Sequence, residues 1–191
     1  MVREAFIKTN VHDYPCGCGS HKPKVVIGRG NSLARLMLIG EAPGETEELV
    51  GKPFVGRSGR LLDQLLEVVG IDCQNGIYIC NVIKTRPPNN RKPTKKEIEK
   101  HLPWLYQQIK LVDPLVIVLA GSTALNSFLG RKSKITLSRG TWQNWNGISV
   151  MPIFHPSYLL RNPSKAPDAP FNLTKLDLIQ VKERWSILMD L

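Results

Sequence analysis

Four short apolar runs, separated by segments of helical periodicity, constrain the fold of this chain more than any other feature. The runs cover Arg35–Gly40, Ile77–Val82, Leu115–Ala120 and Ile148–Phe154, and each is bounded by glycine, proline or asparagine. Nearly continuous apolar character over so few residues is typical of strands that are buried on both faces of a parallel sheet. We therefore expect four parallel strands.

The segments between these runs carry helical signals. Leucines recur at helical spacing ahead of Gly70, and Thr94 forms a capping box with Glu97 at the start of a second amphipathic segment. The expected helices cover Leu61–Val69, the segment from Thr94 to Asp113, Ser122–Leu129 and Leu173–Leu188.

Strands that alternate with helices predict βαβ units with right-handed crossovers. The expected fold is a three-layer α/β/α domain with a central four-stranded parallel sheet, formed by residues 1–191 as one domain. Ligands of such sheets bind outside the carboxyl ends of the strands. We therefore look for chemistry in the segments that directly follow the strands.

Composition fits a compact protein with a polyanionic partner. The 191 residues are 42% hydrophobic, and 26 Lys and Arg against 16 Asp and Glu give a net charge of +10. Such a charge suits nucleic acid but is also found in ribosomal and heparin-binding proteins. The start lacks the apolar core of a signal peptide, and no run is long enough to span a membrane. We expect a cytoplasmic protein that binds no membrane and is a monomer.

Common nucleotide-binding motifs are excluded by the glycine pattern. The phosphate-binding sequence G-x-x-x-x-G-K-[ST] does not occur, and Gly28-x-Gly30 lacks the third glycine of a dinucleotide fingerprint. Four cysteines in this spacing do not suggest a disulfide framework, so reduced thiols are expected.

Two glycine-rich segments follow the first expected strand. They are Gly40–Glu45 and Gly51–Gly59, and they bracket an aromatic residue, Phe54. Glycine allows the backbone to approach a ligand closely, and an aromatic face can stack on a nucleobase. In the alternative interpretation the glycines only form turns and Phe54 belongs to the core.

Asn81 stands at the end of the second expected strand, and His155 directly follows the fourth. A side-chain amide offers one acceptor and two donors and can therefore read the edge of a flipped base. An asparagine at a strand end is more often a turn former, and a lone histidine is more often structural. Their common position at the carboxyl edge of the sheet favours a site.

Taken in order, the blocks G-E-A-P-G-E, G-K-P-F-V-G-R-S-G, N-V-I-K-T-R-P-P-N-N-R and H-P-S-Y-L-L-R-N-P resemble the signature blocks of family-four uracil-DNA glycosylases. This resemblance covers the chain from Cys16 to the C-terminus. It implies a monofunctional enzyme that hydrolyses the N-glycosidic bond of deoxyuridine in single- or double-stranded DNA. A non-catalytic damage-sensing module and a glycosylase with another base specificity are the alternatives.

The resemblance also implies roles for residues of the pocket. Phe54 would stack on uracil, Asn81 would bind its polar edge, and the backbone of Gly40 to Gly44 would form a wall. His155 would stabilise the leaving base. Ala42 stands where other uracil glycosylases have an aspartate that orients water, so Glu41 is our candidate for that task, although Glu41 can equally be structural.

Further residues would contact DNA by the same resemblance. Leu159 would enter the space that the flipped nucleotide vacates, with Arg161 on a phosphate. The remaining expected contacts are Lys84, Arg86, Arg91, Lys92 and Ser157. The stretch Lys84–Lys96 holds six basic residues and no acidic one, and a solvated loop is its alternative interpretation.

The metal ligands of the family are altered in this chain. Members of the family bind a [4Fe-4S] cluster through a C-x-x-C pair, a cysteine in the N-V-x-K-C-R-P-P block and another on the following helix. Here Cys16 and Cys18 are one residue apart, and Thr85 and His101 stand at the other two places. Because such clusters require thiolates, we expect that the cluster is lost. Zinc held by Cys16, Cys18, His21 and His101 is the alternative.

Overall fold

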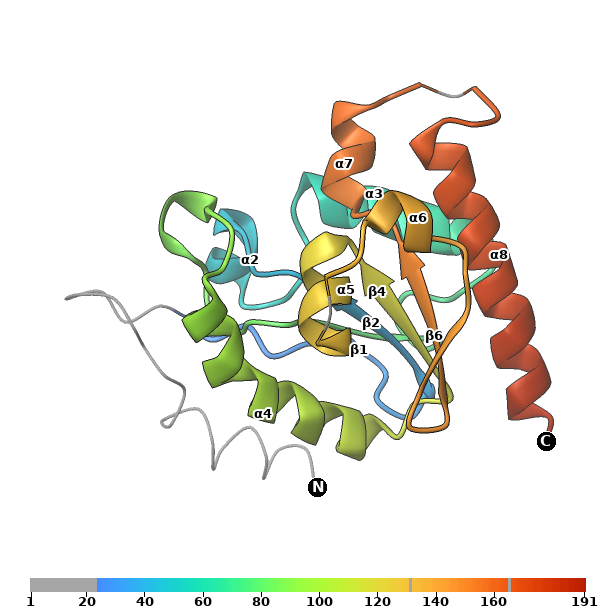
Figure 1. Ribbon diagram of the computed structural model, residues 1–191, viewed down its shortest axis with the longest axis horizontal. Helices are drawn as coiled ribbons and strands as arrows, with labels where there is room; N and C mark the ends of the chain where they lie inside the picture. The colour runs from blue at the N-terminus through green and yellow to red at the C-terminus, as the bar shows by residue number, and fades with distance from the viewer. Residues whose placement is uncertain (1–23, 131, 165) are drawn as a thin grey trace.

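A six-stranded mixed sheet forms the centre of the fold in the computed structural model, which describes residues 24–130, 132–164 and 166–191 (Figure 1). The strand order is β1-β3-β2-β4-β6-β5. The strands are β1 (Arg29–Gly30), β2 (Leu36–Gly40), β3 (Tyr78–Asn81), β4 (Val116–Ala120), β5 (Gln143–Trp145) and β6 (Ile148–Ile153).

The four central strands are parallel, as the apolar runs predict. Two short edge strands, β1 and β5, pair antiparallel with β3 and β6 and were missed. Their sequences, Arg29-Gly30 and Gln143-Asn144-Trp145, contain no apolar run because an edge strand is only partly buried. The expected four-stranded sheet is thus correct at its centre and incomplete at its edges.

Helices cover both faces of this sheet. They are α2 (Glu45–Val50), α3 (Arg57–Val68), the 3-10 turn η1 (Pro88–Asn90), α4 (Lys95–Val112), α5 (Ser122–Leu129), α6 (Ile135–Ser138), α7 (Pro156–Arg161) and α8 (Pro170–Met189). Thr94 and Glu97 form the expected capping box of α4. The four expected helices are confirmed as α3, α4, α5 and α8, whereas the shorter α2, α6 and α7 gave no clear periodicity.

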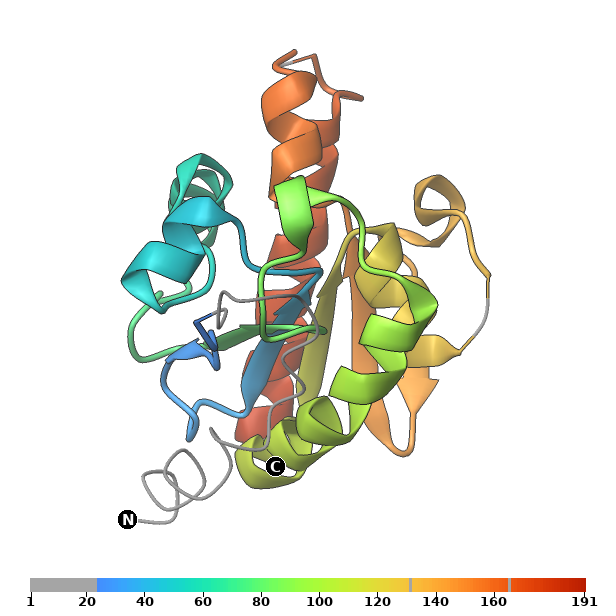
Figure 2. The ribbon, with the colours of Figure 1, turned by 90° about the vertical axis from the view of Figure 1, so that its left-hand side faces the viewer.

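Alternate residues of each strand enter two separate cores. Leu36 and Leu38 of β2 pack in the cluster that contains α3 and α8, whereas Met37 and Ile39 pack in the cluster that contains α4 and α5. Figure 2 shows α3 on one side of the sheet and α4 and α5 on the other. This arrangement is the expected three-layer α/β/α fold.

The order of the strands places a topological switch at β2. The chain moves from β2 to β3 through α3 and then returns past β2 to β4 through α4. Right-handed crossovers in opposite directions place these two helices on opposite faces, so the connections diverge at the carboxyl end of β2. A crevice is therefore expected just after Gly40. In the described part of the chain, no helix is long and apolar enough to cross a membrane.

Candidate active site

A cavity of about 300 Å³ lies at the carboxyl edge of the central strands. Its walls include residues that follow β2, β3 and β6, which are the segments that the sequence singled out. The lining residues are Glu41, Ala42, Pro43, Gly44, Glu47, Phe54, Ser58, Asn81, Pro87, Asn90, Arg91, His155, Ser157 and Arg161. A cavity of this size accommodates a nucleobase.

Gly40, Phe54 and Asn81 are packed against one another at the inner end of the cavity. A Cβ atom at Gly40 would lie 2.4 Å from Cζ of Phe54 and 2.5 Å from Oδ1 of Asn81, so only glycine fits there. Phe54 is 4% exposed and adopts a positive φ of 52°. Phe54 belongs to the core cluster that contains α3 and α8, and it also lines the cavity, so the same ring is part of the core and of the wall of the site.

The side chain of Asn81 is only 2% exposed, and among the described residues its Oδ1 atom has no hydrogen-bond partner. A buried acceptor without a donor costs roughly 1–3 kcal/mol. Because Asn81 lines the cavity, a ligand N–H that enters the cavity can remove this cost.

His155 stands beside Phe54, with ring centroids 5.7 Å apart and the planes inclined by 32°. Its Nδ1 atom accepts a hydrogen bond from the backbone N–H of Ser157 at 3.1 Å, and the Ser157 hydroxyl lies 2.8 Å away. Burial, assisted by the nearby charge of Arg161, lowers the pKa of His155 to about 4. At neutral pH the ring is therefore uncharged, and its single proton is on Nε2, because Nδ1 is an acceptor.

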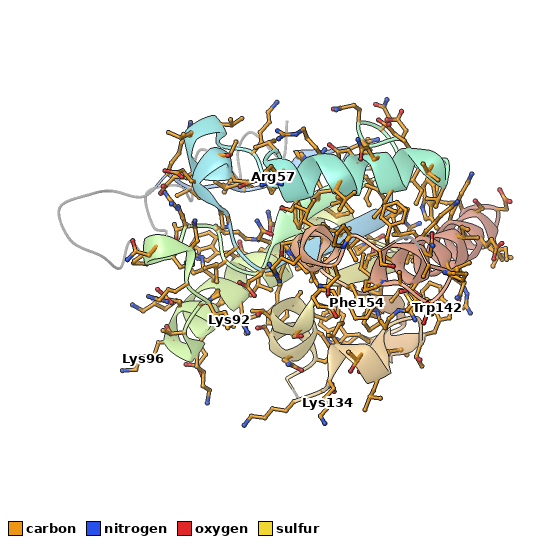
Figure 3. The ribbon with its side chains drawn as sticks, turned by 90° about the horizontal axis from the view of Figure 1, so that it is seen from above. Arg57, Lys92, Lys96, Lys134, Trp142 and Phe154 are labelled. Carbon is orange, nitrogen blue, oxygen red and sulfur yellow. The ribbon has the colours of Figure 1, made fainter. Side chains whose placement is uncertain are left out.

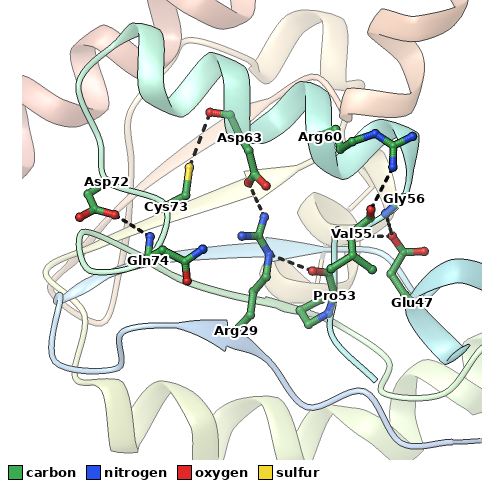
Figure 4. A network of polar contacts seen from close by, with 10 residues as sticks. All are labelled: Arg29, Glu47, Pro53, Val55, Gly56, Arg60, Asp63, Asp72, Cys73 and Gln74. Atoms are coloured by element: carbon green, nitrogen blue, oxygen red, sulfur yellow. Dashed lines mark hydrogen bonds and ion pairs between the residues drawn. The ribbon is translucent and has the colours of Figure 1, made fainter. Parts of the chain in front are cut away.

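One buried carboxylate, that of Glu47, ties the two glycine-rich segments together. Its Oε1 accepts from the N–H groups of Val55 at 2.9 Å and Gly56 at 2.7 Å, and its Oε2 accepts from that of Gly44 at 3.2 Å. Figure 4 shows this carboxylate beside Val55 and Gly56, with Arg29 donating to the carbonyl oxygen of Pro53 from the other side. The backbone on both sides of Phe54 is thus held in place.

Comparisons with known proteins agree with this geometry. Residues 27–179 match the family described as the uracil DNA glycosylase superfamily. The type-4 uracil-DNA glycosylase of Thermotoga maritima is 48% identical over 151 residues, which cover 78% of each chain. That of Saccharolobus solfataricus is 39% identical over 158 residues, 78% of this chain and 72% of the relative. The type-5 enzyme of Pyrobaculum aerophilum is 28% identical over 152 residues, 71% of this chain and 67% of the relative.

The chain belongs to the type-4 uracil-DNA glycosylases. The higher identity to type-4 than to type-5 relatives agrees with the long second block and the H-P-S-Y-L-L-R segment.

Lys84 does not lie on the DNA-facing surface of this glycosylase. It is fully buried, and its Nζ atom donates to the carbonyl oxygen of Asn81 at 2.5 Å and to Oε1 of Gln108. The backbone after β3 continues alongside the end of β2, where the N–H groups of Val82 and Ile83 donate to the carbonyl oxygens of Gly40 and Glu41. The prediction that Lys84 contacts the DNA backbone is therefore wrong, because the loop begins only after this residue.

The other predicted DNA-binding cations differ in their ion pairs and in their exposure to solvent. Arg86 forms an ion pair with Glu48 at 3.3 Å, and Arg91 forms one with Glu97 at 2.8 Å. Lys92 and Arg161 are exposed beside the cavities of the site. Figure 3, seen from above, labels Lys92 near the start of α4.

Leu159 was predicted to be the residue that enters DNA, and this prediction is wrong. Its segment is helix α7 rather than a loop, and the helix turns Leu159 into the core at 2% exposure. The next residue, Leu160, is 38% exposed. The sequence alone did not show which of two adjacent leucines faces the core.

Thr85 and His101 do not fit a [4Fe-4S] cluster. The Nδ1 atom of His101 accepts from the backbone N–H of Lys84 at 3.3 Å, and its Nε2 atom lies 3.5 Å from the Thr85 hydroxyl. The imidazole is buried, which lowers its pKa to about 4. Neither side chain supplies a thiolate. Residues 24–130, 132–164 and 166–191 contain no cluster of His, Cys, Asp and Glu that could hold a metal ion, and Cys16, Cys18 and His21 lie outside this range.

Several lining residues received no role from the sequence. They are Glu47, Ser58, Pro87 and Asn90. Glu47 is three residues after Gly44 at the start of α2, so a helix prediction there would have suggested a carboxylate that bonds to backbone N–H groups.

Proposed function

We propose that this type-4 enzyme excises uracil from DNA by hydrolysis of the N-glycosidic bond of deoxyuridine and leaves an abasic site. The observation that carries the proposal is the buried, unpartnered Oδ1 atom of Asn81 in the same cavity as the neutral imidazole of His155. The names of the relatives, which are type-4 uracil-DNA glycosylases, support it.

Uracil presents an N–H donor between two carbonyl oxygens, and the cavity offers complementary groups. Oδ1 of Asn81 accepts from this N–H, and the uncharged His155 donates from Nε2 to a carbonyl oxygen. Phe54 packs against the face of the base.

Catalysis follows from the charge that develops as the bond breaks. The electron pair of the C1′–N1 bond moves to uracil, so its carbonyl oxygen becomes more negative and the hydrogen bond from His155 strengthens in the transition state. A water oxygen then bonds to C1′. Glu41 accepts the water proton in place of the aspartate that Ala42 replaces.

DNA binding uses the exposed edge of the site. We propose that Lys92, Arg161 and Ser157 contact phosphates, and that the exposed Leu160 takes the wedge role in place of Leu159. Both hydrophobic cores pack on the same sheet. We propose a single-domain monomer that acts on single- or double-stranded DNA.

We also propose that the enzyme works without an iron–sulfur cluster. The polar pair of Thr85 and His101 supports this, because its members bond to each other and to the backbone instead of offering thiolates. Anaerobically purified protein should contain no stoichiometric iron and show no absorption band of a cluster. Iron or zinc bound stoichiometrically and required for activity would contradict the proposal.

The experiment that tests the function is single-turnover release of uracil from a deoxyuridine oligonucleotide by metal-free protein. Undamaged and hypoxanthine-containing oligonucleotides serve as controls, together with His155→Ala. Release that collapses in the variant supports the assignment. Tight binding without release by the wild type indicates a damage-sensing module, and preferential release of hypoxanthine indicates another base specificity.

A further inference from the structure

Glu41 lies in a wall between two cavities. A second cavity of about 420 Å³ adjoins the first, and both are lined by Glu41, Asn90, His155, Ser157 and Arg161. In this wall the hydroxyl group of Thr123 donates a hydrogen bond to Oε2 of Glu41. Thr123 itself lines only the second cavity.

Rigid elements fix both partners of this bond. Thr123 is in the first turn of α5, a helix anchored in the core by Ala124 and Leu125. Glu41 directly follows β2, and its carbonyl oxygen accepts from the N–H of Ile83 at 3.2 Å. The carboxylate is therefore held between two strand ends, those of β2 and β4, rather than on a free loop.

The hydrogen bond from Thr123 makes the two carboxylate oxygens of Glu41 different from each other. A threonine hydroxyl has a single proton to donate, and here it is directed to Oε2. A water molecule that loses a proton needs an acceptor in a fixed position, because a general base acts only within hydrogen-bond reach. Oε1 of Glu41 takes no part in the bond with Thr123, and Glu41 lines the first cavity, so this oxygen can serve as such an acceptor.

We propose that Thr123 is a positioning residue that orients the carboxylate of Glu41 toward the attacking water. This inference rests on the proposed uracil excision. In the reaction the water oxygen bonds to C1′, the C1′–N1 electron pair leaves with uracil, and the water proton passes to Glu41. Thr123 changes neither bond and acts only through Glu41.

The test is a double-mutant cycle of Thr123→Val and Glu41→Gln, measured as single-turnover uracil release at saturating enzyme. Valine keeps the branched shape and removes the hydroxyl. We expect Thr123→Val to slow release about tenfold, the rate equivalent of one hydrogen bond to a charged group, with unchanged affinity for substrate DNA. In the Glu41→Gln background the same substitution should have no further effect.

Two more variants separate this role from a structural one. Thr123→Ser keeps the donor and should restore the rate to within about threefold of the wild type. Thr136→Val, in the second cavity but without a bond to Glu41, is the matched control and should leave the rate unchanged. Thermal melting of each variant shows that the fold is retained.

The outcomes distinguish the two proposals. Absence of uracil release by the wild type refutes the proposed function, and the positioning role falls with it. If the wild type releases uracil normally, any of three results overturns the role of Thr123 and leaves the proposed function intact. These results are that Glu41→Gln is fully active, that Thr123→Val slows release equally in the Glu41→Gln background, or that Thr123→Ser is as slow as Thr123→Val.

Discussion

Replacement of Glu47 by alanine tests whether one carboxylate holds the walls of the pocket together. The substitution removes the acceptor of three backbone N–H groups, those of Gly44, Val55 and Gly56. The glycine-rich segments on either side of Phe54 then lose the bonds that connect them.

The magnitude follows from these three bonds. Hydrogen bonds to a charged group contribute roughly 1.5–3 kcal/mol each, but water that enters the opened pocket satisfies part of the exposed N–H groups. We expect Glu47→Ala to lower the free energy of unfolding by about 2–4 kcal/mol. Glu47→Gln keeps an oxygen for Val55 and Gly56 and loses only the bond from Gly44, so its cost should be about half as large.

Urea-induced unfolding of the wild type and both variants measures these differences in the free energy of unfolding. The rate of single-turnover uracil release shows whether the pocket is still formed correctly. Release by Glu47→Ala should fall about tenfold or more at a urea concentration where the protein remains folded, because Phe54 and Ala42 are no longer pre-organised. The reasoning is refuted if Glu47→Ala loses less than about 0.5 kcal/mol, or if the glutamine variant is as unstable as the alanine variant.

Three shorter predictions concern other residues. Gly40→Ala should abolish uracil release while the protein still unfolds cooperatively, since its Cβ would meet Phe54 and Asn81; an active variant would show that the pocket is wider. The lowered pKa of His101 favours its neutral form in the folded state, so stability present above pH 6.5 should be lost as the pH falls toward 4, by about 2–3 kcal/mol, and urea unfolding of His101→Gln should show a flatter pH dependence. Lys92→Met should reduce the salt dependence of DNA binding by about one phosphate contact, whereas Lys84→Met should leave it unchanged and only destabilise the protein, as titrations at several salt concentrations will show.

The sequence predicted the centre of the fold well because buried parallel strands produce continuous apolar runs. It missed β1 and β5, since edge strands lack that signal. Asn81 was found because it stands at the end of such a run and His155 because it directly follows one, and the structure brings them into one cavity. Their roles in catalysis remain predictions.

The errors share one cause, which is that burial depends on contacts distant in sequence. Lys84 belongs to a basic stretch, yet Gln108 and the backbone of Asn81 accept its hydrogen bonds inside the protein. Leu159 and Leu160 are adjacent and chemically identical, and only the packing of α7 against α3 and α8 decides between them. Glu47 was missed because the short helix α2 was not predicted, so its place three residues after the N-cap residue Gly44 was not recognised.

The strand order also has a consequence for how the protein folds. The central strands β2 and β4 are joined through a long segment that contains β3, α3 and α4, so their pairing is a contact of high sequence separation. Closure of such a long loop slows folding. Glu41 follows β2 and His155 follows β6, so these two residues come together only after β4 and β6 have joined the sheet. Any fragment that contains both must include the whole chain from Glu41 to His155. During refolding, recovery of enzymatic activity should therefore lag behind the formation of helical structure.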